Sequence, residues 1–170
     1  MDAEHLESCL AQAWWEAALR VDVRDFFLDA RAQVDARVTR ERPLCLASGG
    51  CCNFEAHGHL LYVSGLEAAF TVLRLSALHG IEVSADQLQA SRERGDCPYL
   101  QGLFCGAHHE RPLGCRIYFC DERAVHWQSE LYESTHQGVQ RLHERLGLPY
   151  RYMEWRAALH CVLSAREAVG

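Results

Sequence analysis

The sequence has no apolar run that approaches the roughly 20 residues of a membrane-spanning helix. Its first residues, MDAEHLESCLAQAWWEAALR, are acidic and amphipathic, without the basic start and the following apolar block of a secretory signal. These two absences argue against a membrane partner. They predict a cytoplasmic location, where thiols are kept reduced.

Positive charge is also scarce. The chain has 17 lysine and arginine residues against 23 aspartate and glutamate residues, which gives a formal net charge of −6 and a sequence pI of about 5.9. Binding to nucleic acid depends on many cationic contacts with phosphate groups. The charge balance therefore argues against a nucleic-acid partner and leaves a protein or a small molecule as the expected partner.

The motifs of several enzyme classes are missing as well. The sequence has no dinucleotide-binding fingerprint, no phosphate-binding loop of the Gly-x-x-x-x-Gly-Lys type, no serine nucleophile elbow and no recognisable site for S-adenosylmethionine. No motif of this kind supports catalysis. Whether the chain is an enzyme stays open at this point.

Helical periodicity dominates both ends of the chain. Apolar residues recur at intervals of three and four over residues 4–40, which contain no glycine and no proline; this predicts one long helix, or two with a break near Asp22. Residues 122–168 predict two further amphipathic helices, separated at Gly147 and Pro149. One apolar stripe in this part consists of Trp127, Leu131, Val139, Leu142 and Leu146.

Two helix starts in the middle of the chain carry the pattern of a capping box, in which a serine and a residue three positions later bond each other's backbone amides. Ser64 with Glu67 predicts a helix that ends at Gly80, and Ser84 with Gln87 predicts a helix that ends near Gly95. The short apolar run at residues 59–63 predicts a strand before the first of these helices.

The chain is rich in cysteine, with nine in 170 residues. Cys9 and Cys161 lie in amphipathic helices and are interpreted as small core residues. In a reducing compartment, many clustered thiols indicate a metal site and not disulfides. The candidate metal ligands are the other seven, which we expect to meet in space: Cys45, Cys51, Cys52, Cys97, Cys105, Cys115 and Cys120.

Thiolate sulfur is a soft ligand that suits Zn²⁺ or an iron–sulfur cluster, and each of these takes four protein ligands. Seven thiols exceed one such site and fall one short of two. Two arrangements remain open. One is a four-cysteine centre with three helper thiols, and the other is a full centre beside one that keeps an open coordination position.

The spacing of these cysteines resembles the cysteine-cluster family described as a putative zinc- or iron-chelating domain. Cys45, Gly49, Cys51 and Cys52 fit its opening Cys-x-x-Cys-Gly-x-Cys-Cys pattern, with Ser48 at the second cysteine position. The segments CPYL, from Cys97, and RPLGCR, which contains Cys115, match its later motifs, and Cys105 lies between them. The resemblance covers residues 45–120.

The resemblance implies metal chelation by these cysteines. Proteins similar to this domain include lysine methylating enzymes of flagellin that carry an iron–sulfur cluster, so the resemblance favours a [4Fe–4S] cluster over zinc. Arg111 and Arg116 are expected beside this cofactor, where their guanidinium groups offset the negative charge of the thiolates. Among the histidines, His108 or His109 is the candidate to complete a site that has only three cysteines.

The fold class expected from these features is mainly α: amphipathic helices surround a small, irregular, cysteine-rich metal-binding core with short strands. The whole chain, residues 1–170, is expected to form a single domain, in which helices over 4–40 and 122–168 flank the core at 45–120. Within that core, residues 96–121 contain few apolar side chains. We therefore expect metal to hold these loops, with short strands at 98–100 and 116–119.

Two functions follow. The first is a metal-binding protein with a cysteine-ligated iron–sulfur cluster or zinc. Whether it is also a redox enzyme, or an enzyme that modifies a protein or a small molecule, stays open. The alternative is a non-enzymatic protein-interaction module in which zinc is structural.

Overall fold

A computed structural model describes residues 3–45 and 48–169, with side chains from Leu10 to Arg166. The described chain is mainly helical, as the sequence predicts, and no described helix has the length and hydropathy needed to cross a bilayer. The α-helices are α1 (Ala3–Ala18), α2 (Val21–Glu41), α3 (Gly65–His79), α4 (Ala85–Arg94), α5 (Leu113–Ile117), α6 (Val125–Leu146) and α7 (Trp155–Val169).

The strands are short and form two antiparallel pairs. One pair joins β1 (Tyr62–Ser64) to β4 (Tyr152–Glu154), with Val63 opposite Met153. The other joins β2 (Leu100–Gln101) to β3 (Phe104–Cys105). The β1–β4 pair connects the middle of the chain to its last helix, a long-range contact that the local pattern does not predict.

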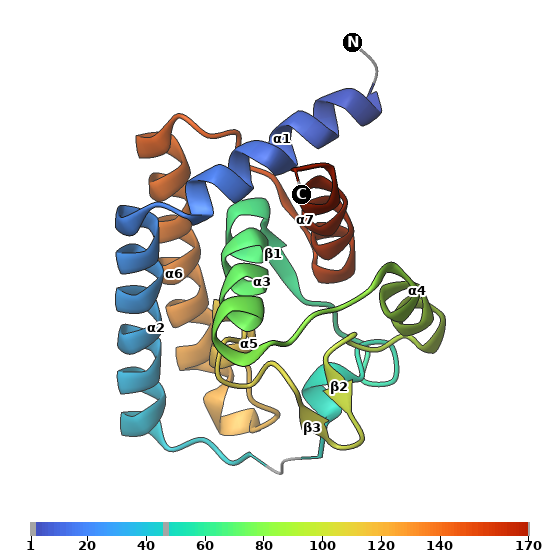
Figure 1. The fold of residues 1–170 in the computed structure, drawn as a ribbon. Helices are drawn as coiled ribbons and strands as arrows, with labels where there is room; N and C mark the ends of the chain where they lie inside the picture. Colours follow the sequence, from blue (N-terminus) through green and yellow to red (C-terminus); the bar gives the residue numbers. More distant parts are fainter. Residues whose placement is uncertain (1–2, 46–47, 170) are drawn as a thin grey trace.

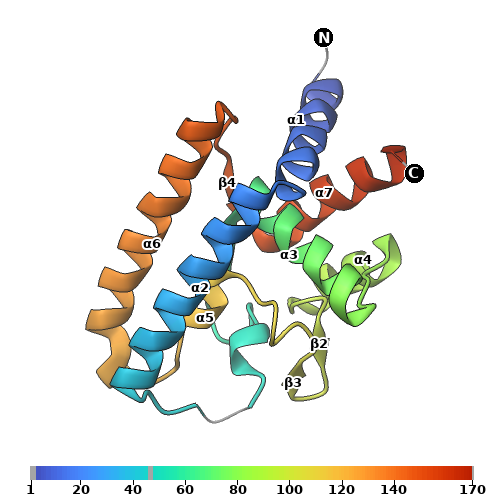
Figure 2. The ribbon, with the colours of Figure 1, turned by 60° about the vertical axis from the view of Figure 1, so that its left-hand side comes forward.

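The helices are arranged around α3. Figures 1 and 2 show α1 crossing near α3 and α7, and α2 running antiparallel beside α6 on the other side of the molecule. The helix α4 and the β2–β3 hairpin lie together at one end (Figure 1). The cysteine-rich loops are therefore attached to one side of a helical scaffold.

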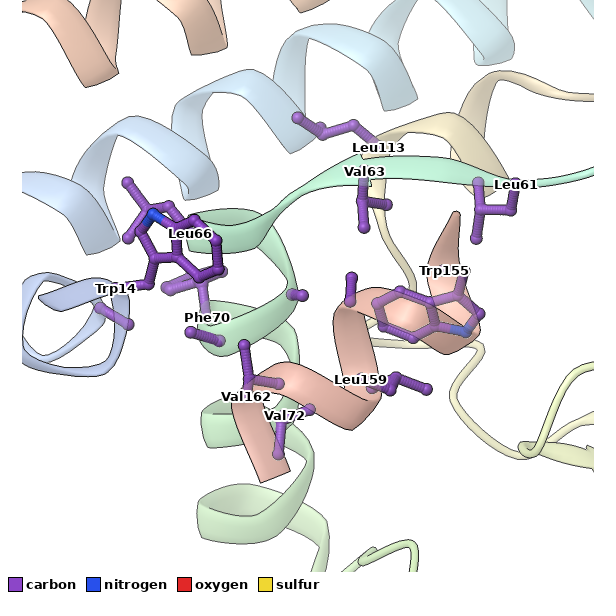
Figure 3. Packing of buried hydrophobic residues seen from close by; sticks show 14 of the residues in the cluster. Trp14, Leu61, Val63, Leu66, Phe70, Val72, Leu113, Trp155, Leu159 and Val162 are labelled. Atoms are coloured by element: carbon purple, nitrogen blue, oxygen red, sulfur yellow. The ribbon is translucent and has the colours of Figure 1, made fainter. Parts of the chain in front are cut away.

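The centre of the core is formed by large apolar side chains of α1, α3 and α7. Figure 3 shows Trp14 beside Leu66, and Trp155 below Leu61 and Val63. All of them are at most 9% exposed. Each fully buried large apolar side chain stabilises the fold by about 1.5–3 kcal/mol. Packing of amphipathic faces is thus the main source of stability for the helices.

The helix ends largely follow the sequence signals. The capping box of Ser84 and Gln87 is formed, and Gly80, Gly95 and Gly147 end their helices in the left-handed conformation. At α3 only half of the expected box is present, since Ser64 accepts from the Glu67 amide but the Glu67 carboxylate does not return to Ser64. That carboxylate instead accepts a hydrogen bond from the Leu113 amide at 2.7 Å.

Several boundaries differ from the sequence prediction. Of the two possibilities for the first helical region, one long helix or two, the structure has two helices. The break between them lies at Leu19 and Arg20, before Asp22. The strand expected at 59–63 is formed at Tyr62–Ser64, because its partner β4 fixes the register. The strand expected at 116–119 was wrong, since Arg116 lies in α5, where the chain turns to meet α2 and α6.

The expectation that residues 96–121 contribute little to the core also needs correction. Tyr99, Leu113 and Ile117 are each less than 5% exposed and belong to the hydrophobic core. Tertiary contacts, which the local pattern does not reveal, bury even the few apolar side chains of this segment. The second half of residues 96–121 is therefore attached to the hydrophobic core by contacts that do not depend on metal.

A buried charge cluster provides a further anchor for the same segment. The Glu110 carboxylate accepts hydrogen bonds from Arg31 of α2 and from Arg74 of α3, with distances of 2.7 and 3.0 Å to Arg74. Both guanidinium groups lie over the ring of Phe70, 5.0 and 5.8 Å from its centre. This cluster fixes the chain between Cys105 and Cys115 to the helical scaffold.

Candidate metal centre

The two cysteine motifs are joined by a backbone hydrogen bond. Gly49, with φ of 71°, starts a 3₁₀ turn at Gly50–Cys52, and the Cys97 amide donates to the Cys52 carbonyl at 2.8 Å. A Cβ at Gly49 would lie 3.2 Å from the Leu103 carbonyl oxygen, so this glycine also permits close approach of the hairpin. The 44 residues between the two motifs thus form a closed loop at the site.

The β2–β3 hairpin returns the chain to Cys97. Leu100 pairs with Cys105, and Gly102 turns the hairpin with φ of 63°. The Gly106 amide then donates to the Tyr99 carbonyl at 2.8 Å, which closes the hairpin base. As a result, Cys97 and Cys105 both lie close to Cys52 of the 3₁₀ turn.

Three thiols surround the thiol of Cys52 at this junction. Cys52 is linked by side-chain hydrogen bonds to Cys105, Cys51 and Cys97. The bond from Cys52 lowers the pKa of Cys51 to about 6 and that of Cys105 to about 7, because the S–H group stabilises their thiolates. The same contacts raise the pKa of Cys52. We call these four side chains the thiol cluster.

Cys115 lies beside the thiol cluster, on α5. Burial raises the pKa of its thiol well above the ordinary value, and the charges of Cys97 and Cys105 raise it further. The positive charge of Arg111 acts in the opposite direction on Cys51, Cys105 and Cys115. Within the described residues, the buried Nε of Arg111 has no hydrogen-bond partner. The Arg111 guanidinium therefore acts on these three thiols, and its Nε is an unused donor within the described residues.

Arg116 has a different environment. Its guanidinium donates to the Asp35 carboxylate at 3.0 and 3.1 Å, to the Arg111 carbonyl at 3.2 Å and to the His109 carbonyl. These contacts attach α5 to α2. Arg116 thus attaches the segment that contains Cys115 to α2, and its positive charge is paired with the Asp35 carboxylate.

Cys45 and Cys120, two of the seven candidate ligands, are exposed. The backbone next to them is joined by a hydrogen bond of 2.9 Å from the Leu44 amide to the Asp121 carboxylate. Cys120 also has a side-chain hydrogen bond with Tyr118. Cys161 packs against the hydrophobic core, as expected for a core residue, whereas the side chain of Cys9 lies outside the described residues.

One histidine beside the thiols is His59, to which the sequence pattern gives no special weight. Its Nε2 lies 3.2 Å from the Cys51 carbonyl oxygen, its ring stacks on Tyr118, and its buried Nδ1 has no hydrogen-bond partner among the described residues. The rings of His108 and His109 instead contact each other, and His109 contacts His79. No local signal separates His59 from the other histidines.

A cavity of about 680 Å³ adjoins the thiols, between residues 59–62, α5 and the first half of α6. Its wall includes Cys51, Cys115 and Cys120. The first half of α6, which lines this cavity, is the lower part of that helix in Figure 1. The sequence does not reveal it, because it is enclosed by segments about 70 residues apart in the chain.

In the part of the chain that the structure describes, no group of three or more histidine, cysteine, aspartate or glutamate side chains has the geometry of a formed metal site. The thiol cluster nevertheless has the chemistry of a ligand set: soft sulfur donors, lowered pKa values at Cys51 and Cys105, and the nearby Arg111 guanidinium. Its residues therefore fit a thiophilic metal in composition.

Comparison of the chain with known protein families, with curated proteins and with solved structures gives no match. The resemblance to the cysteine-cluster family stays a prediction that rests on the motif residues alone.

Proposed function

We propose that this chain is a metal-binding protein, and that the thiol cluster of Cys51, Cys52, Cys97 and Cys105 provides its ligands. The observation that supports the proposal is the three-way contact of Cys52 with the other three thiols. Several thiolates at such a junction repel one another, and a bound cation removes that repulsion. Two of the four thiols already have a pKa of about 7 or below, which reduces the cost of deprotonation on metal binding.

Two metals are compatible with this donor set. Ligand sulfurs around one tetrahedral zinc ion lie about 4 Å apart, because each Zn–S bond is about 2.3 Å; thiols in direct contact suit this spacing. The resemblance of the motifs favours a [4Fe–4S] cluster. Cys115 is the fifth thiol and is available to either centre, and the Arg111 guanidinium would donate to a metal-bound sulfur.

The test is the metal and acid-labile sulfide content of protein purified without oxygen. Four iron and four sulfide per chain, with broad absorption near about 400 nm, identify the cluster. One zinc per chain without sulfide identifies the mononuclear site. Cys52→Ser should remove most of the metal, because Cys52 is the thiol that contacts all three others. Absence of both metals, or full metal content in the Cys52 variant, would contradict the proposal.

The same centre supports two roles. Reactivity is favoured by the cavity of about 680 Å³ that reaches Cys51 and Cys115, because a centre next to a pocket is accessible to a substrate. The alternative, an interaction module with structural zinc, is favoured by Leu103 and Phe104, which are 61% and 70% exposed at the turn of the hairpin next to Cys105. The exposure of Cys45 and Cys120 is compatible with both roles and does not separate them.

One double variant and one redox measurement separate the two roles. Leu103→Ser with Phe104→Ser should abolish binding of a protein partner if the hairpin is the interaction surface. The same double variant should leave the metal content unchanged, since neither side chain belongs to the thiol cluster. Reversible oxidation and reduction of the purified centre, followed by its absorption spectrum, would instead support a redox role.

A further inference from the structure

The cavity beside the thiol cluster has the size of a small-molecule site. Its volume of about 680 Å³ lies within the range of about 300–1,000 Å³ that is typical of ligand pockets. Cys51, Cys115 and Cys120 are part of its lining, and so is the first half of α6. A ligand in this cavity would be next to any metal that the thiols hold.

Most of the remaining lining is apolar and aromatic. Leu60, Tyr62, Tyr118 and Val125 line the cavity and are each 40–59% exposed, so four large exposed apolar side chains gather at one place. Such a concentration of exposed apolar surface is typical of a binding site, whereas single exposed apolar residues are ordinary. Tyr132 of α6 adds a further aromatic side chain to the lining.

Apart from His59, whose imidazole is cationic when protonated, the charged side chains of the lining have one sign. Asp121, Glu122 and Glu133 line the cavity, and none of the 17 lysine and arginine side chains of the protein does. Asp121 is paired with Arg123, which lies outside the lining. Within the described residues, Glu122 and Glu133 form no ion pair, and Glu133 accepts a hydrogen bond from Gln137.

From this lining we infer that the cavity binds a small organic amine with an aromatic or aliphatic body. The apolar body is buried against Leu60, Ile117 and Val125, and the ammonium group lies over a tyrosine ring or near Glu122 and Glu133. An anion of the same size is repelled by the carboxylates. The inference does not require the metal of the proposed function, because it rests on the side chains that line the cavity.

The test compares two probes of similar size and opposite charge, 2-phenylethylamine and 3-phenylpropanoate, by calorimetric or NMR titration of the purified full chain. We expect the amine to bind at least about tenfold more tightly than the carboxylate. Equal affinity for the two probes, or no saturation by the amine at about 10 mM, would overturn the inference.

Two serines of α6 provide a matched pair of variants. The hydroxyl of Ser129 donates to the Val125 carbonyl at 2.9 Å, and that of Ser134 donates to the Leu131 carbonyl at 3.0 Å. Both are exposed, but only Ser129 lines the cavity. Ser129→Arg should weaken amine binding by about tenfold or more and Ser134→Arg should leave it unchanged. The same loss in both variants would overturn the inference.

Metal analysis of the same samples separates this inference from the proposed function. A chain that holds metal and does not bind the amine contradicts only the inference. A chain that binds the amine with the expected preference and holds no metal supports the inference and contradicts the proposed metal centre.

Discussion

Replacement of Glu110 by glutamine should destabilise the protein strongly, because Glu110 is the only carboxylate shared by Arg31 and Arg74 in the described structure. The side chains of Glu110 and Arg31 are each 7% exposed. Glutamine keeps the size of the side chain and removes its charge. Two guanidinium groups, one of them buried, would then lose their counterion.

The magnitude follows from the protonation of Glu110. Burial alone would raise its pKa, but the hydrogen bonds from Arg74 and Arg31 outweigh burial and lower the pKa from 4.5 to about 2. That difference corresponds to at most about 3 kcal/mol of stability at neutral pH. The side chain of Arg74 is 22% exposed, so solvent screens part of the interaction. We therefore expect Glu110→Gln to lower the free energy of unfolding by about 2 kcal/mol.

The effect should depend on pH in a defined direction. Because the pKa of Glu110 is lower in the folded state than in the unfolded state, its contribution is complete above about pH 4.5 and is lost as the pH falls towards 2. The assay is urea unfolding of both proteins near pH 7 and again near pH 3. The difference between them should fall by more than half at the lower pH.

Glu82→Gln is the matched control. Glu82 also pairs with one arginine, Arg166, but its side chain is 59% exposed, and exposed ion pairs contribute little to stability. The reasoning would be refuted if Glu110→Gln cost as little as Glu82→Gln. It would also be refuted if the cost at Glu110 did not change between the two pH values.

Three further predictions concern other parts of the chain. Cys9→Ala combined with Cys161→Ala should leave the metal content per chain unchanged, and a loss would show that the flanking helices provide ligands. Removal of metal by a chelator should lower the hydrogen-exchange protection of residues 97–106. The stretch that follows, up to the end of α5, should keep its protection through its own contacts with the helical scaffold. Uniform loss or uniform retention of protection across both stretches would contradict this division. Gly65→Ala should destabilise the protein by about 1–3 kcal/mol in thermal unfolding, because a Cβ there would lie 2.3 Å from the Trp14 ring. Gly138→Ala is the control: a Cβ there would have its nearest neighbouring atom at 3.6 Å, so this variant should be neutral or stabilising.

The local features of this fold can be predicted from the sequence. Helical periodicity places α1, α2, α6 and α7, and serine and glycine signals place the ends of α3 and α4. These features are readable because a helix is stabilised by bonds between residues a few positions apart, so its signals stay close together in the chain. From residue chemistry alone, the cysteine spacing predicts a soft metal, and this stays a prediction.

The choice among equivalent residues is made by the tertiary structure. Seven cysteines look alike in the sequence, yet Cys52 contacts three other thiols while Cys120 is exposed. The partner of Glu67 lies at Leu113 and those of Glu110 lie on α2 and α3, far along the chain. Such contacts depend on how the helices pack, and the same packing encloses the cavity beside Cys51. No local pattern encodes them, because their partners are brought together only after the apolar faces of the helices have been buried.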